Sequence, residues 1–126
     1  MKYLLDSDVI IEILRENTKV AAQLRELYLR GNIFCYSPVT KAEIYHGIRS
    51  GEENKTANFF AQLECILIDA KIGEKAGTYL KSYRKSHGVQ LGDALIAASS
   101  FYSKAYLITF NEKHYPMKDI TLHSFS

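Results

Sequence analysis

The sequence predicts an α/β fold in which a central, mainly parallel sheet is flanked by helices on both faces. Short apolar segments of three or four residues, such as 3–5 and 33–36, alternate with longer segments whose apolar residues recur at helical spacing. Continuously apolar strands are typical of parallel sheets that are buried on both faces. Their alternation with helices therefore indicates the α/β class.

The first part of the chain is predicted to run strand, helix, helix, strand. Residues 3–5 form a short apolar strand, and apolar side chains at positions 9, 10, 13 and 14 predict a helix over 9–14. A second helix is predicted over 18–30, because a Gly-Asn pair follows it as a stop signal. The apolar segment 33–36 is the next strand.

The rest of the chain continues the alternation. Pro38 or Thr40 starts a helix over 39–48, and another helix is predicted over 52–63. The later segments are a strand at 65–68, helices at 70–87 and 91–102, and strands at 106–109 and 120–122. Leu91 is expected to begin the inward apolar face of its helix.

Length and composition limit what kind of protein this is. At 126 residues, with 47% hydrophobic and 24% charged side chains, the chain fits one globular domain over residues 1–126. A net charge of +2 is too small to indicate nucleic-acid binding by itself, so any basic surface must be local. The start of the chain has no signal-peptide pattern, and no apolar run approaches the ~18 residues of a membrane span. We therefore expect a cytoplasmic protein without a membrane segment.

Three acidic residues in three separate segments are candidates for a functional site. Asp6 directly follows the first strand, and in a parallel sheet ligands gather beyond the carboxyl ends of strands. Glu43 lies in the predicted helix 39–48, and Asp93 lies in the first turn of the nearly uncharged helix LGDALIAASS. Taken alone, Asp6 is equally well explained as a helix cap, and Asp8 is better explained as a cap or hydrogen-bonding partner than as a ligand.

Converging carboxylates repel one another, so a cluster of them is stable and ionised mainly when a cation lies between them. An all-oxygen ligand set favours Mg²⁺ or Mn²⁺ over zinc. The four histidines show no metal-ligand spacing and are interpreted as surface or packing residues: His46, His87, His114 and His123. A divalent ion at such a site suits phosphodiester hydrolysis.

Four segments resemble the successive motifs of a known family. LLDSDVII, PVTKAEIYHGI, LGDALIAASS and LITFNEKHY are similar, in order and in separation, to the motifs of PIN-domain ribonucleases, specifically VapC-type toxins of toxin–antitoxin pairs. The resemblance implies a three-layer α/β sandwich and an endoribonuclease that depends on Mg²⁺ or Mn²⁺. It also implies an RNA substrate, a cognate antitoxin that blocks the site, and a homodimer.

The resemblance assigns roles to individual residues. Asp6, Glu43 and Asp93 match the three family acids, which act as catalytic residues and metal ligands. The supporting positions are Ser7, Asp8, Thr109, Asn111 and Glu112. Asn111 stands where many PIN domains have an acid, and His114 stands where others have Asp. The number of ions, one or two, is therefore left open, with Glu112 and Asp8 as candidates to compensate.

The expected reaction is in-line attack of a metal-activated water on an RNA phosphodiester, with Glu43 binding the ion through water or orienting the nucleophile. The lysines and arginine of 71–85 are either an RNA-binding surface or a solvated helix face. Helices 18–30 and 52–63 are candidates for antitoxin contact, and an antitoxin Arg could displace the metal.

Two other functions remain as alternatives. A phosphatase of the haloacid dehalogenase type would use Asp6 as nucleophile and Asp8 as general acid, because an acid-x-acid pair after a strand also opens that family. Its later motifs are expected in a different order from the one found here. The second alternative is a non-catalytic PIN-like binding module.

Overall fold

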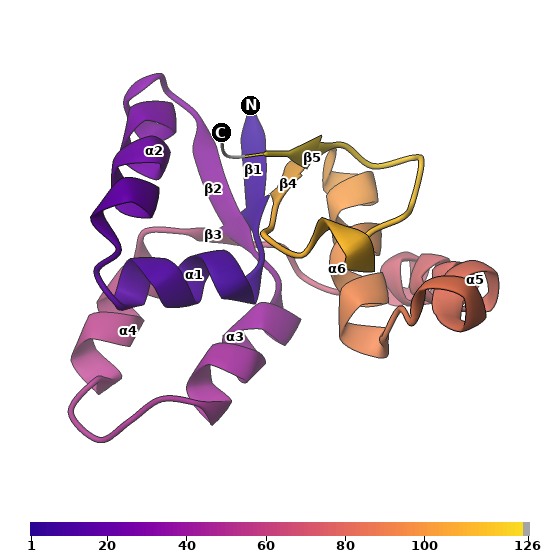
Figure 1. Cartoon of the computed structure of the whole chain (residues 1–126), viewed down its shortest axis with the longest axis horizontal. Helices are drawn as coiled ribbons and strands as arrows, with labels where there is room; N and C mark the ends of the chain where they lie inside the picture. The colour runs from indigo at the N-terminus through magenta and orange to yellow at the C-terminus, as the bar shows by residue number, and fades with distance from the viewer. Residues whose placement is uncertain (125–126) are drawn as a thin grey trace.

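The computed structural model describes residues 1–124 and contains a five-stranded sheet in the order β3-β2-β1-β4-β5 (Figure 1). All strand pairs in it are parallel. The strands are β1 (Lys2–Leu5), β2 (Ile33–Tyr36), β3 (Glu64–Cys65), β4 (Tyr106–Ile108) and β5 (Leu122–His123). The helices are α1 (Ser7–Leu14), α2 (Thr18–Leu29), α3 (Pro38–His46), α4 (Glu53–Ala61), α5 (Ala70–His87) and α6 (Leu91–Ser103), with a short 3-10 helix η1 (Glu112–His114). The last two residues of the predicted domain lie outside the described ones.

The central strand β1 divides the hydrophobic core into two layers. Leu4 points to one face and packs in a cluster with α5 and α6, whereas Tyr3 and Leu5 point to the other face and pack with α1, α2 and α4. This alternation is what a strand buried on both faces requires. Figure 1 shows the two helical layers on opposite sides of the sheet. The predicted three-layer α/β sandwich is confirmed.

The register of β1 and β4 brings two loops together at the carboxyl edge of the sheet. Leu5 is paired with Ile108, and the Asp6 N–H donates to the Ile108 carbonyl at 3.0 Å. The residues that follow the two strands, Asp6 and Thr109, therefore start side by side, although they are far apart in the sequence. A site at this edge can be built from both loops.

Several predicted boundaries differ from the structure. The strand predicted at 65–68 is limited to Glu64–Cys65, because the chain leaves the sheet after Ile66 donates to the Tyr36 carbonyl. Leu67 beyond it is 76% exposed. The last strand is shifted from 120–122 to Leu122–His123.

Two helix predictions are also corrected. The first helix begins at Ser7 rather than 9, because Asp6 acts as its N-cap. Leu91 does not begin the inward face of α6: it is 60% exposed, and the buried face of the helix begins at Ala94. In residues 1–124 no helix is both long and apolar enough to cross a membrane.

Candidate functional site

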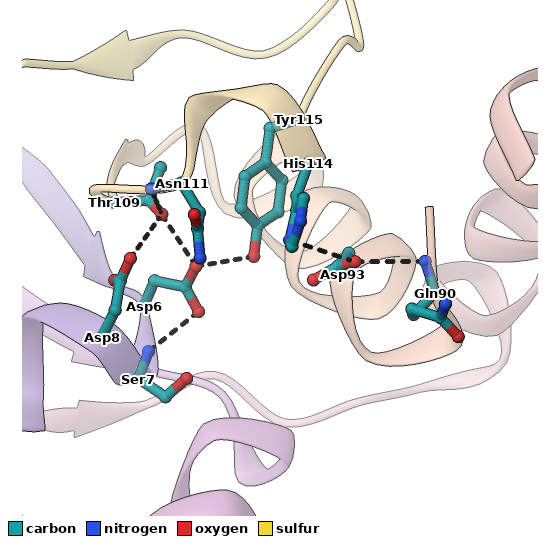
Figure 2. Close-up of polar contacts among 9 residues, drawn as sticks. All are labelled: Asp6, Ser7, Asp8, Gln90, Asp93, Thr109, Asn111, His114 and Tyr115. Atoms are coloured by element: carbon teal, nitrogen blue, oxygen red, sulfur yellow. Dashed lines mark hydrogen bonds and ion pairs between the residues drawn. The ribbon is translucent and has the colours of Figure 1, made fainter. Parts of the chain in front are cut away.

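Asp6 caps α1 and at the same time presents a carboxylate to the end of β4. Its Oδ1 accepts a hydrogen bond from the Ser7 N–H at 2.8 Å. Its Oδ2 accepts from the Thr109 hydroxyl at 2.9 Å and from the Tyr115 hydroxyl at 2.8 Å (Figure 2). The residue is 7% exposed. Asp6 therefore fills both roles that the sequence left open, a cap and a carboxylate fixed at the edge of the sheet.

Asp8 ties the first helix to the loop after β4. Its Oδ2 accepts from the Phe110 N–H at 3.0 Å, and Thr109 Oγ1 lies 3.4 Å away. Thr109 Oγ1 also accepts from the Asn111 N–H at 3.0 Å. Asp8 Oδ1 is buried and has no hydrogen-bond partner within residues 1–124. Asp8 is thus a hydrogen-bonding partner, as one of its two interpretations predicts, and one of its oxygens remains available.

Asp93 reaches the same region from the first turn of α6. It forms a capping box with Gln90, whose N–H donates to Asp93 Oδ2 at 3.1 Å. The same oxygen lies 3.9 Å from His114 Nδ1, as the dashed line in Figure 2 shows. The capping box fixes the side chain of Asp93 while its Oδ1 is free of these contacts.

Glu43 completes the acidic group from α3, which begins at the Ser37 cap with Pro38 in its first turn. Partial burial raises the pKa of Glu43, the charge of Asp6 raises it further, and a hydrogen bond with the Ser7 side chain lowers it. Asp93 and Asp8 also raise it. Four carboxyl groups from three separate segments therefore lie within electrostatic range of one another.

The pKa values of two more carboxyl groups in this region, Asp8 and Asp93, are raised as well. Burial raises the pKa of Asp8, and the charge of Asp6 adds to the effect. Burial also raises the pKa of Asp93, while the Gln90 N–H and the charge of His114 oppose the shift. Desolvation and like charges disfavour the ionised form, and a bound cation would reverse both effects. We name Asp6, Asp8, Glu43 and Asp93 the acidic cluster.

The acidic cluster has the donor chemistry of a Mg²⁺ or Mn²⁺ site. It offers carboxylate oxygens, one of which, Asp8 Oδ1, is buried without a partner in the described residues. Within residues 1–124 no three acidic, His or Cys side chains are positioned to hold an ion together. Mg²⁺ commonly binds through one or two carboxylates and keeps several waters, so the donor set fits such an ion.

The metal-free protein is expected to become more stable as the pH falls from the raised pKa values of the acidic cluster toward the ordinary pKa values of Asp and Glu. The pKa values of Asp8, Glu43 and Asp93 are raised in the folded state from ordinary values of 3.8 for Asp and 4.5 for Glu. The folded protein therefore binds more protons than the unfolded chain between these values and the raised ones. The free energy of unfolding is highest below that window and falls as the pH rises through it.

Thermal melts in EDTA at a series of pH values between about 7 and about 4 measure this effect, and we expect Tm to rise as the pH enters that window. The opposing shift of Asp119, whose pKa is lowered from 3.8, acts at lower pH. Asp93→Asn should make the rise in Tm smaller. A Tm that stays constant or falls over the whole series would contradict the assignment of a repulsive cluster.

Two predicted supporting residues, Glu112 and Asn111, form their hydrogen bonds within residues 1–124 with groups outside the acidic cluster. Glu112 Oε2 accepts from the Ser124 hydroxyl at 2.9 Å, which directs it toward the C-terminal strand. Asn111 contributes its backbone N–H to Thr109, and its side chain is exposed. Ser7 contributes its N–H to Asp6 and its side chain to Glu43.

One residue that contacts the cluster, Tyr115, was not predicted from the sequence. It is 3% exposed and donates to Asp6, and burial and the charge of Asp6 raise the pKa of its phenol so that the proton stays in place. His114, which stands where other family members have Asp, is a surface residue as predicted and also lies beside Asp93. Both follow from the turn of η1, which returns the chain to the edge of the sheet. No spacing pattern in the sequence marks that turn.

Comparisons with known proteins agree on one family. Residues 3–119 match the model of the PIN domain. The chain is 31% identical to Ribonuclease VapC19 of Mycobacterium tuberculosis over 115 residues, covering 90% of this chain and 92% of the relative. It is 33% identical to Ribonuclease VapC10 of the same species over 115 residues, covering 90% and 86%.

A solved structure of a toxin–antitoxin complex shares the fold. The structure is VapBC2 from Rickettsia felis bound to a DNA fragment from their promoter. It matches 100% of this chain and 100% of its own, with a TM-score of 0.82 and 24% sequence identity. At that identity the likeness shows the fold alone.

Proposed function

This chain belongs to the PIN-domain family and, within it, to the VapC-type ribonucleases, and on that basis we propose that it is the toxin of a toxin–antitoxin pair. Its activity is that of a divalent-metal-dependent endoribonuclease that hydrolyses RNA phosphodiester bonds. Residues 1–126 form a single PIN domain that acts in the cytoplasm, where its RNA substrates are. The ion is Mg²⁺ or Mn²⁺, because the available donors are oxygens.

The observation that carries this proposal is the convergence of the acidic cluster at the carboxyl edge of the sheet. Asp6, Glu43 and Asp93 come from three segments, yet each of the latter two has a raised pKa to which Asp6 contributes. A cap would not need three acids in one place. The match to the PIN domain argues against the phosphatase alternative. The convergence of carboxylates favours a catalytic site over a non-catalytic module.

The chain's own residues would hold and orient the reactants. Asp6 and Asp93 are the proposed metal ligands, each held in one orientation by hydrogen bonds to neighbouring groups. A divalent ion, when bound, polarises the phosphoryl group and activates a water. Glu43, with its raised pKa, is placed to orient that water and to accept its proton. Thr109 and Tyr115 keep Asp6 in place during the reaction.

An antitoxin is the proposed protein partner, and a groove on the α1–α2–α4 layer is its proposed contact surface. The groove has a volume of about 400 Å³ and is mainly apolar. Its lining includes Ile13, Leu24, Tyr28, Phe34, Phe59 and Leu63. Helices 18–30 and 52–63, which the sequence singled out, contribute to it. We also propose that an antitoxin Arg enters the acidic cluster and displaces the metal, and that the toxin is a homodimer.

Tyr115→Phe is expected to lower the free energy of unfolding by about 1–2 kcal/mol, because a buried hydrogen bond to a carboxylate is lost. It should also lower RNA cleavage roughly tenfold, because Asp6 loses one of its two hydroxyl donors. Urea unfolding and a cleavage assay measure the two effects.

Tyr79→Phe is the matched control for this variant. The Tyr79 hydroxyl donates to Asp119 at 2.7 Å, away from the acidic cluster. Both variants should be less stable than the wild type. Only Tyr115→Phe should cleave RNA more slowly per amount of folded protein. Equal cleavage by the two variants would show that Tyr115 has only a structural role.

Induced expression in a bacterial host tests the function as a whole. The wild type is expected to arrest growth and to degrade a class of cellular RNA, whereas Asp93→Asn is expected to do neither at equal protein level. Normal growth with intact RNA in both cultures would count against a toxin. Equal growth arrest in both would count against catalysis at the acidic cluster.

A further inference from the structure

A hollow opens beside the acidic cluster, between α1, α3 and α4. It has a volume of about 290 Å³, and Glu43 of the acidic cluster is among its lining residues. Figure 1 shows these three helices around one side of the molecule, with α5 on the opposite side of the sheet. The hollow therefore shares one residue, Glu43, with the proposed site of cleavage.

Two arginines line this hollow without an ion-pair partner in residues 1–124. Arg15 is the C-cap of α1, and its backbone N–H donates a hydrogen bond to the last turn of that helix. Arg49 lies between α3 and α4, where its backbone N–H donates to Glu52 Oε1 at 2.7 Å. The two guanidinium groups are on exposed residues and form none of the ion pairs found in the described residues.

The third cation of the hollow is already engaged. Lys55 Nζ donates to the Leu14 carbonyl at the end of α1, and it lies 3.5 Å from Glu16 Oε1. Lys55 therefore joins α4 to α1 and holds one wall of the hollow. This leaves Arg15 and Arg49 as the cations available to a ligand.

A site that cleaves RNA at an acidic cluster needs cations close by, because the cluster repels the phosphates of the substrate. The net charge of +2 offers no large general attraction. Guanidinium groups suit this role, because they form paired hydrogen bonds with phosphate oxygens and keep their charge at all relevant pH values. Ile11, Ile44 and Ile48 give the same hollow apolar contact area for a ribose or base.

The α5 surface is less suited to the same task. Of its cations, Lys75 Nζ lies 2.7 Å from Asp119 Oδ2, and Lys71 Nζ lies 5.1 Å from the centre of the Tyr102 ring. These contacts use part of the charge that the sequence placed there. The other cations of α5, Lys81, Arg84 and Lys85, form none of the ion pairs found in residues 1–124 either, but Arg15 and Arg49 line the same hollow as Glu43.

We propose that Arg15 and Arg49 bind backbone phosphates of single-stranded RNA next to the bond that is cleaved, so that the hollow is the substrate subsite on the Glu43 side. This inference rests on the proposed function and adds a location and two residues to it. Arg15 and Arg49 are binding residues in this account, and they take no part in proton transfer.

The test measures binding of a fluorescently labelled single-stranded RNA of mixed sequence by anisotropy, in Mg²⁺ buffer at several salt concentrations. All proteins carry Asp6→Asn to keep the RNA intact, which a gel confirms. Adding Arg15→Gln and Arg49→Gln is expected to weaken binding at low salt at least roughly tenfold. The slope of log K against log salt should fall by about 1.4, since each single-strand phosphate contact contributes about 0.7.

The control removes two other positive charges, by Lys104→Gln and Lys118→Gln. Lys104 is the C-cap of α6 in the connection to β4, and Lys118 lies in the segment that leads into β5, so both lie toward the amino edge of the sheet. This pair should leave the affinity within about twofold of the parent. In proteins with Asp6 restored, the arginine pair should raise KM for RNA cleavage much more than it lowers kcat.

Equal loss of affinity in the arginine pair and the lysine pair would overturn the subsite, and so would unchanged binding by the arginine pair. If the wild type still cleaves RNA in either case, the proposed function stands and only the subsite is wrong. If the Asp6→Asn parent does not bind RNA and the wild type does not cleave it, both the subsite and the proposed function are wrong. Circular dichroism melts check that all variants are folded.

Discussion

Asp6→Asn is expected to lower kcat/KM for RNA cleavage by at least about 10³-fold while leaving the fold intact. The substitution removes the negative charge of Asp6, which raises the pKa of both Glu43 and Asp93. The amide oxygen can still accept the Ser7 N–H, because Asn is as good an N-cap as Asp. The amide NH₂ in place of Oδ2 cannot accept the Thr109 and Tyr115 hydroxyls, so the folded variant is expected to melt at a lower temperature than the wild type. Cleavage of labelled RNA, with a melting curve for each protein, measures the effect.

Asp69→Asn is the matched control, because Asp69 caps α5 in the same way, with Oδ1 accepting from the Ile72 N–H at 3.0 Å. Both substitutions replace a capping Asp by Asn, but only the one at Asp6 alters the acidic cluster. Full cleavage by Asp6→Asn, or an equal loss in both variants, would contradict the assignment of Asp6 as a metal ligand.

Thr109→Val is expected to lower the free energy of unfolding by about 2 kcal/mol and to lower cleavage by roughly 10–100-fold. The hydroxyl that is lost donates to Asp6 and accepts from the Asn111 N–H, so one substitution removes both hydrogen bonds. Valine has nearly the same shape, so the effect reports the hydroxyl and not the packing. Urea unfolding and cleavage assays measure the two losses.

Thr40→Val provides a sharp comparison for this variant. Thr40 is fully buried, and its Oγ1 has no hydrogen-bond partner within residues 1–124. Removing an unsatisfied buried hydroxyl is expected to leave stability unchanged or to raise it. If Thr40→Val destabilises the protein as much as Thr109→Val does, the hydrogen bonds of Thr109 are not the cause of its effect.

The sequence predicts the layers of this fold well because its strongest signals are periodic. Continuous apolar strands such as 33–36 and helical spacing such as that of 70–87 reflect burial over many residues, which single exceptions do not change. The edge strands were predicted less well. β3 and β5 have only two residues each, and their limits depend on pairing with a neighbour that a local pattern does not contain.

The residues of the candidate site also differ in how well the sequence predicts them. Asp6, Glu43 and Asp93 could be selected because each is an acid beside apolar residues, and the family resemblance assigned them their roles. Tyr115 could not, because the turn of η1 that brings it to the cluster depends on tertiary contacts. His114 was noted only as standing where other family members have Asp, and its approach to Asp93 depends on the same turn. Sequence patterns therefore find the charged groups of such a site more readily than the groups that hold them in place.

The most direct test of the central claim is cleavage of purified cellular RNA by the purified protein, with Mg²⁺, with Mn²⁺ and with EDTA, for wild type and Asp93→Asn. The account predicts defined cleavage products only for the wild type and only when a divalent ion is present. Cleavage that persists in EDTA, cleavage by Asp93→Asn at the wild-type rate, or intact RNA under every condition would contradict it.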